Sequence, residues 1–222
     1  MKKWIKNQPA IMNIYYSLRF FFLGNKKSIQ GTNNRLVYTG ALLKNVIISI
    51  VGNNNTIVLG EASAFIACNI QIRGDDHLLD IGARGIFNQC AFKFEDHHAR
   101  INIGNDTTIH KDGEISAVEP FSSVEIGDGC MFASNIDIRN TDSHSILDRN
   151  TGVRINPGKN IVIGNRVWAG AYVTILKGVC IGNNSIIGIR SLVNKNIPEH
   201  CLAAGIPAKV IRTDVDWCKE RI

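Results

Sequence analysis

Residues 161–193 read IVIGNRVWAGAYVTILKGVCIGNNSIIGIRSLV, and from Ile163 onward every sixth residue is aliphatic or alanine. Four residues after each of the first five of these positions, the side chain is small or β-branched. The two sets are Ile163, Ala169, Ile175, Ile181, Ile187 and Val193, and Val167, Val173, Val179, Ser185 and Ser191. A period of six matches neither an amphipathic helix nor a two-sided strand. It is typical of stacked coils with three short flat faces, whose aliphatic side chains point inward.

The corners of such a coil need residues that turn within a few positions, and Gly, Asn and Asp do this most readily. The segments IGNR, IGNN and IGDG supply these residue types after the aliphatic position. Earlier in the chain, apolar–glycine pairs recur at a spacing of 22 residues, which equals three hexads with four residues added. These pairs are Leu59-Gly60, Ile81-Gly82 and Ile103-Gly104. The pattern predicts one domain of stacked coils from about Gly31 to Val193. A β-sandwich shares such corners but does not explain six consecutive hexads.

The predicted organisation of the chain has three parts. Residues 1–30 form an N-terminal helical cap, residues 31–212 form the coiled domain with a loop at 139–160, and residues 213–222 form a C-terminal tail. A short helix is expected at the C-terminal end. The fold class is therefore mainly β.

The composition is that of an ordinary folded protein, with 45% hydrophobic and 20% charged residues among 222. The net charge of +6 suits an anionic partner such as a phosphorylated cofactor, an acidic polysaccharide or a lipid surface. A solvated basic surface is the alternative interpretation. No basic run or nucleic-acid-binding motif occurs, so nucleic acid is not an expected partner.

Six cysteines are spread along the chain without a C-x-x-C pair. This distribution lacks the density of a small secreted disulfide framework, so it predicts reduced thiols and a cytoplasmic protein. Several of the cysteines fall where the repeat requires a small residue, which indicates a packing role. A catalytic cysteine is the alternative.

The N-terminus combines basic residues with a short apolar run, as a signal peptide does. Asn13 and Arg19 interrupt that run, however, and no small-residue cleavage site follows it. The run is also too short to span a bilayer. We expect a helix from roughly Pro9 to Leu23 that caps the open end of the coils. Weak contact with a membrane surface is the alternative role, and it would place the protein at the inner face of the membrane.

Residues 139–146, RNTDSHSI, interrupt the periodic pattern with a polar stretch centred on His144. A loop that leaves the coil at a corner can present a side chain outside the packed core. A histidine, with an ordinary pKa of ~6.5, suits a general base at neutral pH. An exposed histidine without a role is the alternative. Asp142 could orient the imidazole or begin a turn, and Glu114 and Arg139 are candidates for substrate contacts by neighbourhood alone.

Residues 164–212 resemble the acetyltransferase signature of the hexapeptide-repeat acyltransferases, and the resemblance extends over roughly residues 45–212. It implies a left-handed parallel β-helix. Within the family, the likeness is to bacterial O-acetyltransferases that modify surface sugars of capsules, sialic acids and lipopolysaccharides. The implied reaction moves acetyl from acetyl-CoA, without a metal, to a sugar or polysaccharide acceptor. The implied assembly is a homotrimer with active sites shared between subunits.

The resemblance also assigns roles to individual residues. His144 falls on the catalytic histidine of the family, and Trp168 on the tryptophan that sialic acid O-acetylating members place beside it. An exposed Trp168 is expected because its ring would overfill a thin coil. Ala171 aligns with a residue whose N–H contacts the cofactor and is a candidate oxyanion donor. The next coil is expected to contribute a cofactor contact around Ile189, where many relatives carry a small residue, and Ile189 and Arg190 alter the wall of the groove there.

Three cations align with positions near the nucleotide phosphates of acetyl-CoA: Lys195, Lys209 and Arg212. Ordinary surface charge is the alternative for each.

Several other functions fit parts of this pattern. Serine acetyltransferases and amino-sugar N-acyltransferases share the fold, and acceptor contacts lie on variable loops. A γ-type carbonic anhydrase needs three zinc-binding histidines, but the chain has no H-x-x-x-x-H pair, and the neighbours His97 and His98 would point to opposite faces of a strand. A non-catalytic β-helix scaffold would not need the His144 loop.

Overall fold

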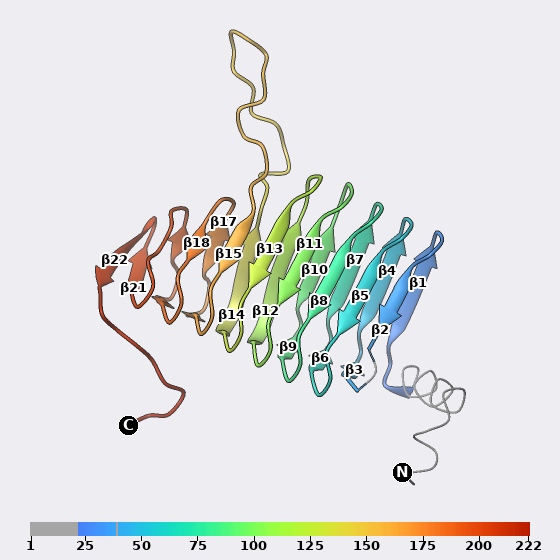
Figure 1. Cartoon of the computed structure of the whole chain (residues 1–222), viewed down its shortest axis with the longest axis horizontal. Helices are drawn as coiled ribbons and strands as arrows, with labels where there is room; N and C mark the ends of the chain where they lie inside the picture. Colours follow the sequence, from blue (N-terminus) through green and yellow to red (C-terminus); the bar gives the residue numbers. More distant parts are fainter. Residues whose placement is uncertain (1–21, 39) are drawn as a thin grey trace.

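The structure is a computed structural model that describes residues 22–38 and 40–222. It is a solenoid of stacked coils in which short strands pair in parallel with the coils on either side (Figure 1). Two hydrogen-bonded sheets result, one of 15 strands and one of seven. Because the larger sheet turns a corner within its longest strands, the coil has three flat faces.

Each face is named after its first strand. The β1 face contains β1 (Lys26–Gln30), β4 (Ile47–Val51), β7 (Asn69–Arg73), β10 (Ala91–Phe94), the C-terminal parts of β12 (Thr108–Ala117) and β14 (Met131–Arg139), β17 (Thr174–Leu176) and β20 (Leu192–Val193). The β2 face contains β2 (Arg35–Val37), β5 (Thr56–Leu59), β8 (Leu78–Ile81), β11 (Arg100–Ile103), β13 (Ser123–Ile126), β15 (Ile161–Ile163) and β18 (Cys180–Ile181). The β3 face contains β3 (Leu42–Lys44), β6 (Ala64–Ile66), β9 (Ile86–Asn88), the N-terminal parts of β12 and β14, β16 (Trp168–Ala169), β19 (Ile186–Ile187) and β21 (Leu202–Gly205), and β22 (Ala208–Arg212) pairs antiparallel with β21.

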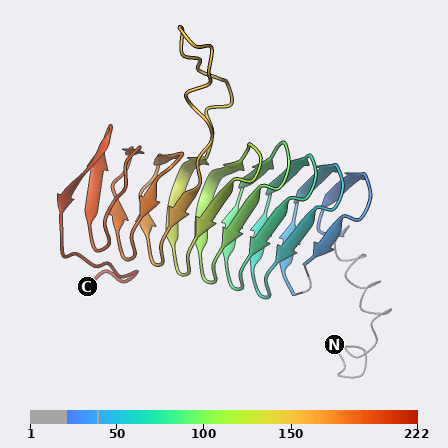
Figure 2. The same cartoon turned by 45° about the horizontal axis from the view of Figure 1, so that its top comes forward.

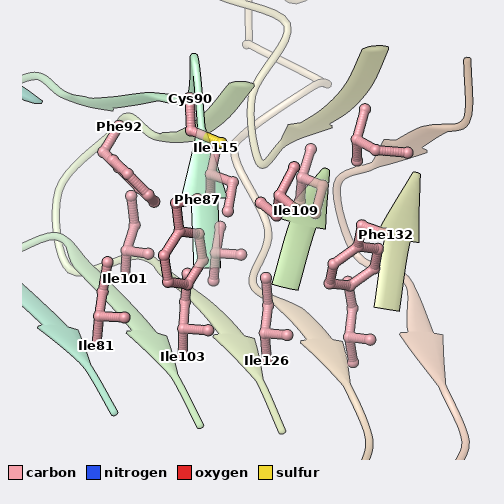
Figure 3. Close-up of a cluster of buried hydrophobic side chains, with 14 of the residues drawn as sticks. Ile81, Phe87, Cys90, Phe92, Ile101, Ile103, Ile109, Ile115, Ile126 and Phe132 are labelled. Carbon is pink, nitrogen blue, oxygen red and sulfur yellow. The ribbon is translucent and has the colours of Figure 1, made fainter. Parts of the chain in front are cut away.

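The predicted inward positions form the core. Every aliphatic or alanine residue of the hexads between 163 and 193 is buried, as is every small or β-branched residue of the second set. The 22-residue spacing is confirmed by strand register, since Leu59 pairs with Ile81 and Ile81 with Ile103. The resulting column of isoleucines faces Phe87 and Phe132 across the coil (Figure 3).

Phenylalanine rings fill the wider coils of the N-terminal half. Phe65 and Phe87 stack with ring centres 5.0 Å apart, and Phe92 meets Phe87 edge-on at 6.0 Å. Four of the six free cysteines are also buried, which confirms their predicted packing role. They are Cys68, Cys90, Cys130 and Cys201. The added residues of each 22-residue coil therefore enclose aromatic as well as aliphatic side chains.

Three corners separate the faces. The loop corner joins the β1 and β2 faces, and residues 140–160 leave the solenoid there as a long projection (Figure 1). The tail corner joins the β2 and β3 faces at Asn165 and Arg166. The Ala171 corner joins the β3 and β1 faces. Coils stack tightly at these corners: a Cβ on Gly52, whose φ is +146°, would collide with the carbonyl oxygen of Gly74.

The two ends differ from the predictions made for them. The predicted N-terminal cap, residues 1–30, lies largely outside the described residues, and its last part, Lys26–Gln30, is strand β1 paired with β4. The predicted C-terminal helix is wrong, because residues 208–222 contain strand β22 followed by irregular chain. β22 supplies hydrogen bonds to the exposed edge of β21, which a helix could not do. Among residues 22–38 and 40–222, no helix has the length and hydrophobicity needed to cross a membrane.

Candidate active site

The stem of the projecting loop is closed around one carboxylate. Glu119, on the coil before the loop, accepts two hydrogen bonds from the Arg154 guanidinium, at 2.6 and 3.1 Å. The Thr141 hydroxyl donates to Glu119 at 2.5 Å and the Gly158 N–H at 2.8 Å. The chain segments that enter and leave the loop are therefore both hydrogen-bonded to Glu119.

Glu119 carries its charge in this position despite partial burial. Burial by itself raises the pKa of the carboxyl, but the hydrogen bonds from Arg154, Thr141 and Gly158 favour the ionised form and together lower the pKa below its usual value. Sequence reasoning missed this residue, since 35 residues separate it from Arg154 and no motif joins them.

His144 is fixed by its main chain while its ring is exposed. Its N–H donates to the Asp142 carbonyl oxygen at 2.7 Å, and its carbonyl oxygen accepts from Asn156 Nδ2 at 2.8 Å. Asn156 is buried at the centre of the stem, and its side-chain oxygen accepts the Ile146 N–H at 2.6 Å. The backbone around His144 is thus held on both sides, and no hydrogen bond to its ring occurs within the described part of the chain.

The Asp142 carboxylate holds the loop against the next coil. Its Oδ2 accepts from Lys177 Nζ at 2.5 Å and from Asn156 Nδ2 at 2.8 Å. The bond from Lys177 is the main cause of its lowered pKa, with that from Asn156 second. Of the two roles considered for Asp142, the structure supports a turn and anchor rather than contact with the imidazole of His144.

A polar groove of about 170 Å³ begins at Ser143, the residue before His144, and follows the β1 face. Within it, Lys93 binds Glu114 at 2.6 Å, and Arg139 binds Asp137 at 2.7 Å. Its lining consists of Lys93, Glu95, Glu114, Ser116, Val118, Arg139, Thr141 and Ser143. Glu114 and Arg139, singled out from neighbourhood alone, therefore do line the surface next to the histidine.

Trp168 lies on the β3 face, between the tail corner and the Ala171 corner. The residue is 38% exposed, as predicted, and its side chain borders a mostly apolar groove of about 390 Å³. The groove is lined by Ile86, Asn88, Thr108, Ile109, His110, Met131, Phe132, Ala133 and Trp168. His110 is the histidine that shares this groove with Trp168, and sequence reasoning gave it no role.

The main-chain N–H groups at the Ala171 corner differ in their hydrogen bonding. Those of Gly170 and Tyr172 donate to neighbouring coils, whereas the N–H of Ala171 between them has no partner among the described residues. The N–H of Ile189 is likewise unpaired within that part of the chain. Because Ala171 accepts the Arg190 N–H at 2.8 Å, the two corner turns stack directly. The structure thus places Ala171 and Ile189 on stacked corner turns.

Arg190, which departs from the usual pattern of the resembled family, is accounted for at this corner. Its guanidinium lies over the Tyr172 ring, 4.7 Å from the centre. The charged group of Arg190 therefore lies across the corner, on the ring of Tyr172. The neighbouring Ile189 is 64% exposed.

The three predicted cations do not lie together. Lys209 pairs with Ala204 and Arg212 with Leu202 in the terminal hairpin, so both extend the β3 face. Lys195 follows β20 at the loop corner. In one chain the candidates therefore form two groups, His144 with Lys195 at the loop corner, and the remaining candidates on or beside the β3 face.

Metal-binding side chains are scattered in residues 22–38 and 40–222: no three His, Cys, Asp or Glu residues there are grouped so that they could hold an ion.

Comparison with known proteins identifies the repeat. Residues 160–195 match the family model described as bacterial transferase hexapeptide (six repeats). A polysialic acid O-acetyltransferase of Neisseria meningitidis is 36% identical over 160 residues, covering 68% of this chain and 69% of the relative. A galactoside O-acetyltransferase of Escherichia coli K12 is 38% identical over 116 residues, covering 51% of this chain and 54% of the relative.

Solved structures give the same result over nearly the whole chain. The polysialic acid O-acetyltransferase OatWY superimposes with a TM-score of 0.82 at 33% identity, covering 89% of this chain and 92% of that one. The polysialic-acid-specific acetyltransferase NeuO gives a TM-score of 0.68 at 28% identity, with 89% and 90% coverage. The family resemblance seen in residues 164–212 is thereby confirmed. The chain belongs to the hexapeptide-repeat O-acetyltransferases.

Proposed function

We propose that this enzyme transfers acetyl from acetyl-CoA to a hydroxyl of an acidic bacterial surface polysaccharide, with His144 as general base. The observation that carries the proposal is the locked stem of the loop, which fixes the main chain of His144 at both polar groups while its ring is exposed. The names of the relatives, two of which act on polysialic acid, support the acceptor class.

In the proposed mechanism, a ring nitrogen of His144 accepts the proton of the attacking sugar hydroxyl, because that hydroxyl is a poor nucleophile while protonated. The N–H of Ala171 donates to the oxygen on which negative charge develops, and it is suited to this because it has no competing partner in the described chain. The imidazolium of His144 then returns the proton to the departing sulfur. The products are the acetylated sugar and free CoA thiol.

The division of the candidates into two groups supports a shared site. His144 projects from the loop corner, whereas Trp168 lies on the face opposite that corner. In the proposal, the loop of a second copy reaches the β3 face of the first, so that His144 of one subunit and Trp168 of the next contact one substrate. A closed ring of three subunits, the homotrimer implied by the family resemblance, forms three such sites.

The residues that would contact acetyl-CoA fit its chemistry. The unpaired N–H of Ile189 can donate to an amide oxygen of the pantetheine arm, and Lys209 and Arg212 can bind phosphates. Lys195, at the loop corner, would come from the same subunit as His144. We also propose that the coils wind in the left-handed sense, as the family resemblance implies.

An anionic acceptor fits the charge of the chain as a whole, which is +6. The groove that begins at Ser143 offers Arg139 and Lys93 beside the acidic Glu95 and Glu114. We further propose a cytoplasmic location, supported by six cysteines with no disulfide among them. We also propose weak contact between a membrane surface and the helix expected from roughly Pro9 to Leu23, a segment that lies almost entirely outside the described residues.

The test offers acetyl-CoA with a panel of acceptors and follows the release of CoA thiol. Acidic polysaccharides, with oligosialic acid as the first probe, should support turnover, and neutral galactosides should support less. Serine and amino sugars serve as controls for the alternative acyltransferases. Turnover on amino sugars alone would contradict O-acetyl transfer, and no thiol release with any acceptor would favour a scaffold.

A further inference from the structure

The C-terminal tail, residues 213–222, returns along the solenoid after β22. β22 runs antiparallel to β21 and ends at the tail corner, where the tail continues toward earlier coils (Figure 2). There the Val215 N–H donates to the carbonyl oxygen of His200 at 3.0 Å, and a ring nitrogen of His200 lies 3.3 Å from the Val215 carbonyl oxygen. The tail is therefore attached to the coil corner before it reaches Trp217.

Trp217 is anchored at this corner by polar groups on its ring and main chain. Its indole N–H donates to the Arg166 carbonyl oxygen at 2.6 Å, and only 8% of the residue is exposed. The Arg166 guanidinium lies 5.3 Å from the centre of the indole and donates to the Trp217 carbonyl oxygen at 3.0 Å. It also reaches Asp216 at 3.3 Å.

The anchored ring of Trp217 packs against Trp168. The two ring centres lie 6.1 Å apart with an interplanar angle of 48°, a favourable tilted arrangement. Trp168 also borders the 390 Å³ groove with Met131 and His110. The indole of Trp168 thus lies between the tail and the groove. On a flat strand face without Trp217, it would have a wider range of orientations.

We infer that Trp217 is a positioning residue for acetyl transfer, which holds the indole of Trp168 in the orientation that serves the groove. This inference rests on the proposed function, in which Trp168 contacts the substrates. The tail acts as a strap. Its hydrogen bonds with His200 and Arg166 take no part in the reaction, but they fix the ring of Trp217. A displacement of about 1 Å at a reacting group costs on the order of a hundredfold in rate.

The experiment compares Trp217→Ala, Trp217→Phe and Trp217→Leu in the full-length enzyme, alone and combined with Trp168→Ala. Trp217→Ala should lower kcat/KM for the acceptor about ten- to a hundredfold, and Trp217→Phe should restore most of it because a ring remains. In the Trp168→Ala background, Trp217→Ala should cause no further loss. Cys218→Ala, at the exposed neighbouring position, is the control and should retain full activity.

A spectroscopic readout reports the contact independently of turnover. Two indoles this close should couple, so the near-ultraviolet circular dichroism of the pair should disappear equally in Trp217→Ala and Trp168→Ala. If Trp217→Ala fails to fold, Trp217→Leu keeps the apolar volume and allows the same comparison. Trp217→Leu with unchanged kcat/KM, or losses that add in the Trp168→Ala background, would overturn the positioning role.

The design separates this inference from the function it rests on. Full activity of Trp168→Ala would remove Trp168 from the mechanism and overturn both that assignment and the strap, even with the coupling signal present. A strongly impaired Trp168→Ala beside a fully active Trp217→Ala would overturn the strap alone and leave the proposed site intact.

Discussion

His144, the proposed general base, has an ordered main chain although its ring is exposed. Its N–H and carbonyl oxygen are both hydrogen-bonded within the loop, to Asp142 and Asn156, while its ring is exposed. A base held in this way loses little orientation when the substrate arrives, since its backbone is already ordered. At the scale of single residues, the competing base is His110, which shares the groove with Trp168.

We predict that His144→Ala folds and assembles normally but loses about 10²–10⁴-fold in kcat, the usual contribution of a general base. His110→Ala is the matched control, because it removes an imidazole from the Trp168 groove and should leave kcat within a factor of about ten. Steady-state kinetics at saturating substrates measure both. The reverse pattern would move the role of base to His110.

At the scale of elements, the loop stem depends on a contact between coils that are distant in sequence. Glu119 joins Thr141, Arg154 and Gly158, and Asp142 joins Lys177. These bonds hold the loop of residues 140–160 without any core of its own.

We predict that Glu119→Gln loosens the loop while the coils remain folded. The substitution keeps the size of the side chain but removes the charge that binds Arg154, and a hydrogen bond to a charged group contributes about 1.5–3 kcal/mol. Trypsin should then cut after the exposed Arg149 at least about tenfold faster, and kcat should fall. Arg84→Gln, which breaks an exposed ion pair with Asp106, is the control and should not change cleavage. Equal cleavage rates in Glu119→Gln and the parent would contradict the clamp.

The same stem should respond to acid. The pKa values of Glu119 and Asp142 lie below their ordinary values because both carboxylates accept hydrogen bonds from cationic side chains. A lowered folded-state pKa stabilises the loop above the unfolded values of about 4, and this stabilisation is lost as the pH falls through the folded values. Hydrogen-exchange protection of residues 141–158, corrected for intrinsic rates, should be constant from about pH 8 to 5 and decrease below about pH 4. A loss of protection near neutrality would point to another group.

The terminal hairpin is the second element that carries function in this proposal. We predict that Lys209→Ala and Arg212→Ala each weaken acetyl-CoA binding about ten- to a hundredfold, from the loss of one charge-assisted bond worth about 1.5–3 kcal/mol. The KM for the acceptor should change little. Calorimetric titration with CoA measures this, and Lys195→Ala tests the cation at the loop corner. Unchanged affinity in the two hairpin variants would remove β22 from the cofactor site.

At the scale of the whole molecule, the solenoid separates the two groups of candidate residues. The loop corner and the β3 face lie on opposite sides of every coil, so the distance between them is set by the coil itself. The proposed shared site would therefore follow from the architecture as much as from the residues.

We predict that co-expressed His144→Ala and Trp168→Ala chains complement each other. Each variant alone should be impaired, but random mixing in a homotrimer leaves about one quarter of the sites with an intact His144 from one subunit and an intact Trp168 from the next. Thiol release by the mixture should recover to that fraction of the parent activity. Light scattering should give a trimer mass, and a mixture no better than its separate variants would place both residues in one chain.

The amino-acid sequence alone determined the coils, their inward residues and the exposed position of His144. The physical reason is that each coil repeats the same local pattern, so one aliphatic residue in every six defines the core without knowledge of distant contacts. The corner turns followed from Gly, Asn and Asp in the same way. The error at the C-terminus came where the repeat stops, because pairing of β22 with β21 follows from an unpaired strand edge rather than from a period.

Only the tertiary structure decided which residues act together. Glu119 and Arg154 are 35 residues apart, and Arg166 and Trp217 are 51 apart, yet each pair meets at a corner where successive coils stack. Such contacts depend on how many coils separate two side chains and on where a loop or tail turns back, and the hexad period carries neither. The separation of His144 from Trp168 by the width of the solenoid has the same origin. The sequence pattern indicates where a residue lies within its own coil, whereas the distance across the coil depends on the folded coil as a whole.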